Sequence, residues 1–156
     1  MSEIRLEHVT AANEVVRALV AELDDELAAP YAADQHHGFS VESIFQSEMK
    51  FFVAFSSGKA VGCGGVAFED GFAEVKRMYV RASARGQGVA QAILARLEAE
   101  ALEKGYRRLT LETGDVQHAA IKIYQRAGFS VCPAFGDYLS KEPHTIERSV
   151  FFEKSI

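Results

Sequence analysis

Residues 85–90, which read R-G-Q-G-V-A, combine residue types that can bind a phosphate group. A strand-like run at 73–80 precedes this segment, and a run of helical periodicity at 91–104 follows it. A glycine-bearing turn between a strand and a helix directs unpaired backbone N–H groups and the positive end of the helix dipole at one small volume. Anionic groups bind in such volumes. We therefore expect a pyrophosphate to bind here, at Arg85, Gly86, Gln87, Gly88, Val89 and Ala90.

Two familiar phosphate-binding turns are excluded by single residues of this segment. The P-loop requires Gly-Lys-Ser/Thr, whereas Gly88 is followed by Val89 and Ala90. The dinucleotide-binding fingerprint G-x-G-x-x-G requires a glycine where this chain has Gln91. The turn must therefore belong to another class of phosphate-binding site.

The segment resembles the signature Q/R-x-x-G-x-G/A of the GNAT superfamily of acyl-CoA-dependent N-acyltransferases. Arg85, Gly88 and Ala90 occupy its defining positions, in the strand–turn–helix context that the family shows. The resemblance covers most of residues 50–156, and its other matching segments are the strand 74–80, L-E-T at 111–113 and I-Y-Q-R-A-G-F at 123–129.

This resemblance implies an N-acetyltransferase. Acetyl-CoA would be the acyl donor, and a primary amine of a small molecule would attack it directly in a ternary complex, without a covalent enzyme intermediate. The resemblance also implies that the end of the strand before the turn contacts the coenzyme. Its backbone would pair with the pantetheine arm like an added strand, at Met78, Tyr79 and Val80.

Acetyl transfer to an amine also requires the movement of protons. A free alkylamine has a pKa of about 10.4 and must lose a proton, and the leaving thiolate benefits from a nearby acid. The resemblance places Tyr124 where family members carry a tyrosine facing the coenzyme sulfur, so we expect Tyr124 to be the general acid. The alternative is a tyrosine that packs its ring on the sheet and sends its hydroxyl to solvent.

Two glutamates are candidates for the base. Glu74 lies early in the strand that leads to the turn and matches the position of a catalytic glutamate in some relatives; alternatively it is a solvated strand carboxylate. Glu112 alternates with Leu109 and Leu111 along a strand expected to be central, where partial desolvation would raise its pKa; alternatively it forms an ion pair. The sequence does not choose between Glu74 and Glu112.

The acceptor pocket is expected where relatives build it, from two loop regions. Its candidate residues are Tyr31, His37, Asp137 and Tyr138. No metal is expected, because the neighbouring His36 and His37 have no third ligand at helical spacing. Cys63 and Cys132 are expected to be small buried hydrophobes rather than nucleophiles.

The elements that position these residues follow from the hydrophobic periodicity. Strands are expected at 4–9, 51–55, 60–68, 73–80, 107–113, 129–132 and 146–153. Helices are expected from a cap at Thr10 to Pro30, at 41–46, at 91–104 and from a cap at Asp115 to Ala127. Residues 133–145 are expected to form a polar, turn-rich loop. The fold class is α/β (α+β), with one mixed, mostly antiparallel sheet flanked by helices on both faces, as in the GNAT fold.

The bulk composition narrows the class of protein. A chain of 156 residues with 48% hydrophobic and 25% charged residues is expected to form one domain, 1–156. The net charge of −5 argues against nucleic acid as a partner. No segment has transmembrane length, and two cysteines make no disulfide framework, so we expect a cytoplasmic protein without membrane contact. A homodimer is expected by resemblance only.

Two other functions remain open from the sequence. The chain can instead acetylate a protein, at an N-terminus or a lysine, which requires an open groove for a peptide. It can also be a non-catalytic acyl-CoA-binding regulatory module, which predicts cofactor binding without turnover.

Overall fold

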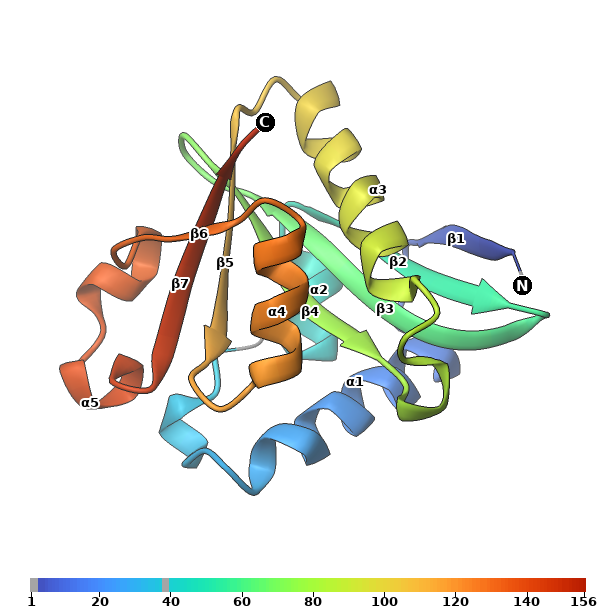
Figure 1. Cartoon of the computed structure of the whole chain (residues 1–156), viewed down its shortest axis with the longest axis horizontal. Coiled ribbons are helices and arrows are strands. Elements are labelled where there is room, and N and C mark those ends of the chain that lie inside the picture. Colours follow the sequence, from blue (N-terminus) through green and yellow to red (C-terminus); the bar gives the residue numbers. More distant parts are fainter. Residues whose placement is uncertain (1–2, 38–39) are drawn as a thin grey trace.

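The alternating and apolar runs of the sequence form a seven-stranded sheet in the computed structural model, which describes residues 3–37 and 40–156. The strands follow the order β1-β2-β3-β4-β5-β7-β6 (Figure 1). Their bounds are β1 Ile4–Val9, β2 Met49–Ser56, β3 Lys59–Phe68, β4 Ala73–Val80, β5 Arg108–Gly114, β6 Ser130–Val131 and β7 Ser149–Ser155. Within the described residues, β4 and β5 pair in parallel and every other neighbouring pair is antiparallel, which confirms the predicted mixed, mostly antiparallel sheet.

Five helices and three short 3₁₀ turns occur in the described part of the chain. The helices are α1 Glu14–Ala28, α2 Val41–Gln46, α3 Val89–Glu103, α4 His118–Arg126 and α5 Pro143–Ile146. The 3₁₀ turns are η1 Ala33–Gln35, η2 Ala82–Ala84 and η3 Gly136–Ser140. None of these helices combines the length and the apolar character needed to cross a bilayer.

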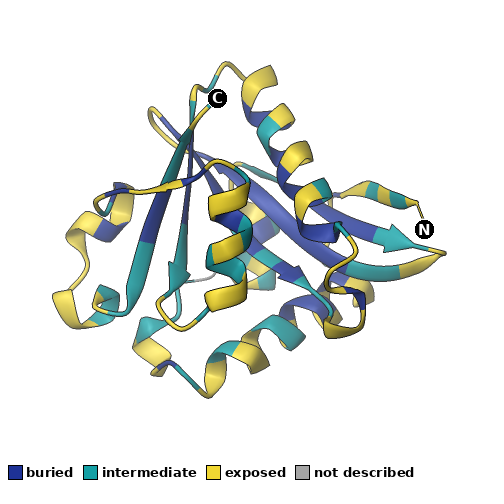
Figure 2. Cartoon of the chain, in the orientation of Figure 1, coloured by how far each residue is buried: buried dark blue, intermediate teal, exposed yellow. Residues whose placement is uncertain are grey.

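The helices cover both faces of the sheet because successive strand residues point to opposite sides. Phe52 of β2 packs in the cluster that contains the apolar faces of α3 and α4. Its neighbour Phe51 packs in a second cluster with α1 and α2. The central strands are accordingly buried along most of their length (Figure 2). This two-sided covering confirms the predicted arrangement of layers.

Glycines of β3 allow α3 to pack unusually close to the sheet. A Cβ on Gly64 would lie 2.8 Å from Cγ2 of Ile93, and a Cβ on Gly62 would lie 2.6 Å from the carbonyl oxygen of Tyr79. Contacts below 3.0 Å force a neighbour to shift, so these positions need glycine. The close approach fixes the start of α3, and with it the turn at 85–90, against the end of β4.

Two predicted helix caps are wrong. The side chain of Asn13, rather than Thr10, caps α1 by accepting a hydrogen bond from the Val16 amide at 2.9 Å. Asp115 does not cap α4, which begins at His118. The Asp115 carboxylate instead pairs with the guanidinium of Arg148 at 2.9 Å. For Asp115, a partner 33 residues away that the local pattern does not reveal determines the position of the side chain.

The prediction that residues 133–145 form a polar loop is also wrong. This segment contains η3 and α5, and two of its aromatic residues, Phe135 and Tyr138, are buried. Both rings pack edge-on against Phe151 of β7, with ring centroids 5.5 and 5.0 Å apart. This third apolar cluster holds Tyr138 in one place beside β4.

Candidate active site

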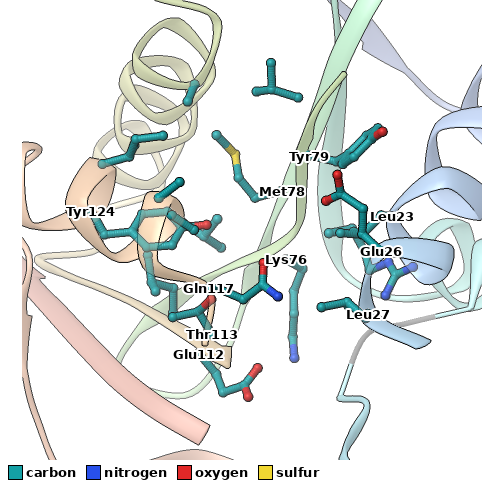
Figure 3. Close-up of a pocket in the computed structure, with 18 of the residues that line it drawn as sticks. Leu23, Glu26, Leu27, Lys76, Met78, Tyr79, Glu112, Thr113, Gln117 and Tyr124 are labelled. Carbon is teal, nitrogen blue, oxygen red and sulfur yellow. The ribbon is translucent and has the colours of Figure 1, made fainter. Parts of the chain in front are cut away.

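A cleft opens in the middle of the sheet because its two parallel strands separate. β4 and β5 pair only over Ala73–Val75 and Leu109–Leu111, and no pairing continues beyond these residues in the described chain. The cleft that begins there has a volume of about 230 Å³ and is bounded by β4, β5, α1 and α4 (Figure 3). The edge of β4 that faces β5 therefore lacks a neighbouring strand beyond Val75. Such an unpaired edge can form backbone hydrogen bonds with an extended ligand, which then lies beside it like an added strand.

A bulge in β4 turns the strand at the cleft. The register with β3 shifts between Cys63 and Gly65, so that Arg77 and Met78 of β4 lie opposite the single residue Gly64. Arg77 has a φ of 54°, in the left-handed region that non-glycine residues rarely adopt. Its buried guanidinium pairs with the carboxylate of Asp24 in α1. The extra residue of the bulge therefore lies on β4.

The bulge directs the following side chains to different walls. Met78 extends on the side of α4, and Tyr79 extends toward α1 (Figure 3). The hydroxyl of Tyr79 donates a hydrogen bond to Glu22 at 3.2 Å. Met78, Tyr79 and Val80 all line the cleft, as the sequence predicts for residues that contact the coenzyme.

The turn at 85–90 presents free backbone donors. Gly86 and Gly88 have φ values of 80° and 85°, and a Cβ on either would meet no atom within 4 Å. Gly88 precedes the first residue of α3. In the part of the chain that the structure describes, the N–H groups of Gln87, Gly88, Val89 and Ala90 make no hydrogen bond to a protein acceptor. The turn thus combines open space, unused donors and a helix N-terminus.

Arg85 is held beside this turn rather than free in solvent. Its Nε donates to the carbonyl oxygen of Val80 at 3.0 Å, and its guanidinium forms an ion pair with Glu26 of α1. Arg85 lines the cleft, so the predicted cation is present. Its charge is partly offset by Glu26, which leaves the backbone amides as the principal donors of the turn.

Tyr124 lies in α4 with its ring buried and its hydroxyl directed into the cleft (Figure 3). The ring packs against Phe129 and Phe152, with centroids 6.1 and 6.3 Å away. Burial, and to a lesser degree the charge of Glu112, raises the pKa of Tyr124 above its usual range. The phenol therefore stays protonated at neutral pH and is available as a proton donor.

Glu74 is a buried carboxylate, with only 5% of its surface exposed, and not a solvated strand residue. Its Oε2 accepts a hydrogen bond from the hydroxyl of Tyr138 at 2.8 Å and forms an ion pair with Nζ of Lys76 at 3.1 Å. Burial raises the pKa of Glu74, while Lys76 and Tyr138 act in the opposite direction. Glu74 lines the cleft at the start of β4, whereas the turn at 85–90 follows the end of β4.

Glu112 reaches the same cleft from β5. Its Oε2 accepts a hydrogen bond from the hydroxyl of Ser149 at 2.6 Å. Burial raises the pKa of Glu112, as predicted, and the Ser149 hydroxyl only partly opposes this effect. No ion pair of Glu112 is present among the described residues, so the expected alternative of a salt bridge does not hold.

A second cavity, of about 240 Å³, lies beyond Glu74. It contains the predicted acceptor residue Asp137 and shares four residues with the first cleft, namely His37, Glu74, Lys76 and Tyr138. Nε2 of His37 lies 2.7 Å from the carbonyl oxygen of Thr145, and burial lowers the pKa of His37, which keeps its imidazole neutral. Within residues 3–37 and 40–156, its Nδ1 is buried without a hydrogen-bond partner. Three predicted acceptor residues, His37, Asp137 and Tyr138, are thus gathered here.

Tyr31 does not belong to this group. It lines neither cavity, and its hydroxyl accepts a hydrogen bond from the Val116 amide at 3.0 Å. A Cβ on Gly114 would lie 1.9 Å from that hydroxyl oxygen, so Tyr31 fills space that glycine leaves free. Tyr31 joins the end of α1 to the end of β5, and its prediction as an acceptor residue is not supported by its position.

The sequence missed Lys76 as a site residue. Its side chain is 10% exposed, and its Nζ lies 3.0 Å from the hydroxyl of Tyr138 as well as 3.1 Å from Glu74. One signal was available, because residues i and i+2 of a strand share a face and Lys76 follows Glu74 at that spacing. In the described residues, no group of histidines, cysteines and carboxylates is arranged to hold a metal ion.

Comparison of the sequence with known proteins shows which family shares it. Residues 11–129 match the family model described as the acetyltransferase (GNAT) family. An IAA acetyltransferase of Azospirillum brasilense is 35% identical over the full length of both chains. An uncharacterized N-acetyltransferase of Bacillus subtilis is 33% identical over 77% of this chain and 78% of its own.

Solved structures share the fold over nearly the whole chain. A Klebsiella pneumoniae protein assigned as an acyl-CoA N-acyltransferase superimposes with a TM-score of 0.75 and 32% identity, and covers 97% of both chains. A GNAT acetyltransferase of Elizabethkingia anophelis, solved with acetyl-CoA bound, superimposes with a TM-score of 0.71 over 100% of both chains. The latter is 19% identical, so it supports the fold alone.

Proposed function

Because the chain belongs to the acetyltransferase (GNAT) family, we propose that it transfers an acetyl group from acetyl-CoA to the primary amine of a small molecule. The observation that carries this proposal is the cleft between β4 and β5. It reaches the turn at Arg85 and Ala90, where the amides are free, and it is also lined by Tyr124, Glu74 and Glu112. The diphosphate of the coenzyme would bind the amides of Gln87–Ala90, and its pantetheine arm would lie along the unpaired edge of β4.

In this proposal the protons move between groups that line the cleft. A carboxylate takes one proton from the acceptor ammonium, and the freed lone pair attacks the carbonyl carbon of the thioester. The N–C bond forms, the C–S bond breaks, and the hydroxyl of Tyr124 donates its proton to the leaving sulfur. The second nitrogen proton restores Tyr124, and the carboxyl proton returns to solvent, so that amide, free coenzyme and one proton are the products.

The acceptor is proposed to enter through the second cavity, on the far side of Glu74. His37, Asp137 and Tyr138 line that cavity, and η3 with the following Lys141 forms part of its wall. A cavity of about 240 Å³ has room for a small amine, whereas a peptide requires an extended groove. This observation favours a small-molecule acceptor over a protein acceptor.

Thermal unfolding with and without acetyl-CoA tests the first half of the proposal. A ligand at 100 times its Kd stabilises the folded state by about 2.7 kcal/mol, so the melting temperature should rise with ligand concentration. Release of free coenzyme thiol over a panel of amines tests the second half. IAA is assayed separately beside the amine panel, because it appears in the name of the Azospirillum brasilense relative. No shift at saturating acetyl-CoA rejects the proposal, and a shift without turnover of any amine supports a regulatory binding module.

We further propose that residues 1–156 form one acetyltransferase domain that works in the cytoplasm as a homodimer. The single continuous sheet supports one domain, and the exposed edge strands β1 and β6 offer surfaces for pairing. Sedimentation equilibrium of the purified chain measures the assembly: a mass near twice the 17.1 kDa of one chain is expected, and a concentration-independent single-chain mass contradicts the dimer.

A further inference from the structure

Three polar atoms meet in the wall between the two cavities. The Tyr138 hydroxyl lies 2.8 Å from Oε2 of Glu74, Nζ of Lys76 lies 3.1 Å from the same oxygen, and Nζ lies 3.0 Å from the Tyr138 hydroxyl. The three form a closed triangle, and their residues line both cavities. The Tyr138 hydroxyl and the Lys76 ammonium both contact Oε2 of Glu74. Among the described residues, none donates a hydrogen bond to the other oxygen, Oε1.

The neighbouring cation decides whether this carboxylate can act as a base. A carboxylate buried on its own favours the neutral acid, which cannot accept a proton. The ammonium of Lys76 and the hydroxyl of Tyr138 favour the ionised form and fix its orientation. The ring of Tyr138 is itself held edge-on by Phe135 and Phe151, so the hydroxyl has a defined position.

Glu112 lacks an equivalent arrangement. Its donor is the neutral hydroxyl of Ser149, and no cation lies within ion-pair distance of it in the described chain. A neutral hydrogen bond stabilises a buried charge less than an ammonium does. Of two carboxylates that reach one cleft, Glu74 is thus the better prepared to be ionised when an acceptor arrives.

Building on the proposed acetyl transfer, we propose that Lys76 and Tyr138 are positioning residues that hold Oε2 of Glu74 and leave Oε1 to take the proton of the acceptor amine. Glu74 is then the base, and Glu112 is not. The N–H bond of the ammonium breaks, an O–H bond forms at Oε1, and the lone pair stays on nitrogen for attack on the thioester. The proton is afterwards lost to solvent through the second cavity.

Other charged and titratable groups also face this wall. Glu112 comes from β5, Glu69 from the β3–β4 turn, and Asp137 and Lys141 from η3 and its end. His37 comes from the segment before α2, and its lowered pKa keeps it uncharged. These groups are common to all variants used below, so differences between the variants report on Lys76 and Tyr138.

The titration of Glu74 tests this inference without any acceptor. The chain is labelled with ¹³C at the glutamate carboxyl carbon, and the Glu74 resonance is assigned by its absence from E74Q. We expect the titration midpoint to move to higher pH in K76M, because the cation is removed, and to stay near the wild-type value in K76R. Y138F should move it in the same direction by a smaller amount. An unchanged midpoint in folded K76M and Y138F overturns the inference.

The pH dependence of turnover tests the choice of base. The acid limb of the kcat/KM profile should move to higher pH in K76M and should be largely restored in K76R. Removal of the hydroxyl that faces Glu112, in S149A, is the matched control and should leave the acid limb in place. Movement in S149A together with no movement in K76M makes Glu112 the base and overturns the inference.

The two proposals fail in different ways. If acetyl transfer itself is wrong, wild type turns over no amine, while the ¹³C titration still reports the effect of Lys76 on Glu74. If only the positioning role is wrong, wild type is active, and K76M lowers the rate equally at every pH without moving the acid limb.

Discussion

The hydroxyl of Tyr124 and the carboxylate of Glu74 differ in the neighbouring groups that affect their pKa values. Burial keeps the proton of Tyr124 in place. Burial also raises the pKa of Glu74, but the ammonium of Lys76 and the hydroxyl of Tyr138 oppose that effect. A phenol whose proton nothing nearby draws away and a carboxylate whose ionised form has a cation beside it are suited to act as acid and base. The proposed roles of both residues follow from this contrast.

Tyr124→Phe should lower kcat by about 100-fold, the lower end of the usual contribution of general acid catalysis. The KM for acetyl-CoA should change little, because the ring remains. Since burial raises the pKa of Tyr124, its proton is not lost in the weakly alkaline range, and the wild-type rate should not fall there through Tyr124. Steady-state kinetics from pH 6 to pH 9 measure both effects.

Tyr106→Phe is the matched control for this prediction. The hydroxyl of Tyr106 bonds the carbonyl oxygen of Glu69 at the surface, and Tyr106 does not line the cleft. Its kcat should equal that of wild type. An equal fall in kcat in both variants, or none in Tyr124→Phe, would remove Tyr124 from the mechanism.

Tyr31→Phe should affect stability rather than catalysis. The lost hydroxyl leaves the Val116 amide without its acceptor, which should lower the free energy of unfolding by about 1 kcal/mol. The KM for the acceptor should stay the same, because Tyr31 lines neither cavity. Urea unfolding and steady-state kinetics measure the two quantities. A raised KM with unchanged stability would return Tyr31 to the acceptor pocket.

At the scale of elements, the separation of β4 and β5 creates the site. The bulge at Arg77 and the close packing of α3 on the glycines of β3 position the two walls of the cleft. The turn at 85–90 connects β4, which carries the bulge, to α3, which packs on the glycines of β3. The proposed binding of the coenzyme therefore depends on the conformation of this turn.

Gly88→Trp should raise the Kd for acetyl-CoA about tenfold or more, because its side chain occupies the space in front of the free amides. Gly58→Trp is the matched control: Gly58 also has a positive φ, 77°, and open space around it, but lies in the β2–β3 turn. Both variants carry similar backbone strain of about 1–2 kcal/mol. Calorimetric titration with acetyl-CoA should show weaker binding in Gly88→Trp alone, and equal binding in both variants would refute the role of the turn.

Features with a local cause were predictable from the sequence. The bounds of β4 and the glycine-bearing turn follow from short patterns, and both occur as predicted. Contacts between distant parts of the chain were not predictable. Lys76 and Tyr138 are 62 residues apart, and burial of Tyr138 depends on Phe151. The fold and the glycine-bearing turn at one end of the cleft were therefore predictable from the sequence, whereas the arrangement around Glu74 needed the structure.

At the scale of the whole molecule, the buried carboxylates should lower stability at neutral pH. A glutamate with a raised pKa in the folded state binds more protons folded than unfolded, so stability falls as pH rises above the unfolded pKa. Glu112 is such a group and has no compensating ion pair in the described chain. Keeping this carboxylate buried in the cleft therefore lowers the free energy of unfolding at neutral pH.

Glu112→Gln should accordingly stabilise the protein at neutral pH, since the amide keeps a hydrogen-bond acceptor for Ser149 without a buried charge. The gain should shrink as the pH falls below the unfolded glutamate pKa, where Glu112 is protonated in both states. Glu74→Gln should destabilise instead, because it leaves the ammonium of Lys76 without its carboxylate. Urea unfolding at several pH values measures both variants, and equal changes of the same sign would contradict this account.

The most direct test of the central claim is to observe the backbone amides of the turn while coenzyme A is added. In ¹H–¹⁵N spectra of the assigned protein, the resonances of Gln87, Gly88, Val89 and Ala90 should shift strongly and saturate together as the diphosphate accepts their hydrogen bonds. The amide of Gly58, in a turn of similar φ, should not move. If saturating coenzyme A leaves these four resonances in place and shifts amides elsewhere, the assignment of the turn as the coenzyme site is wrong.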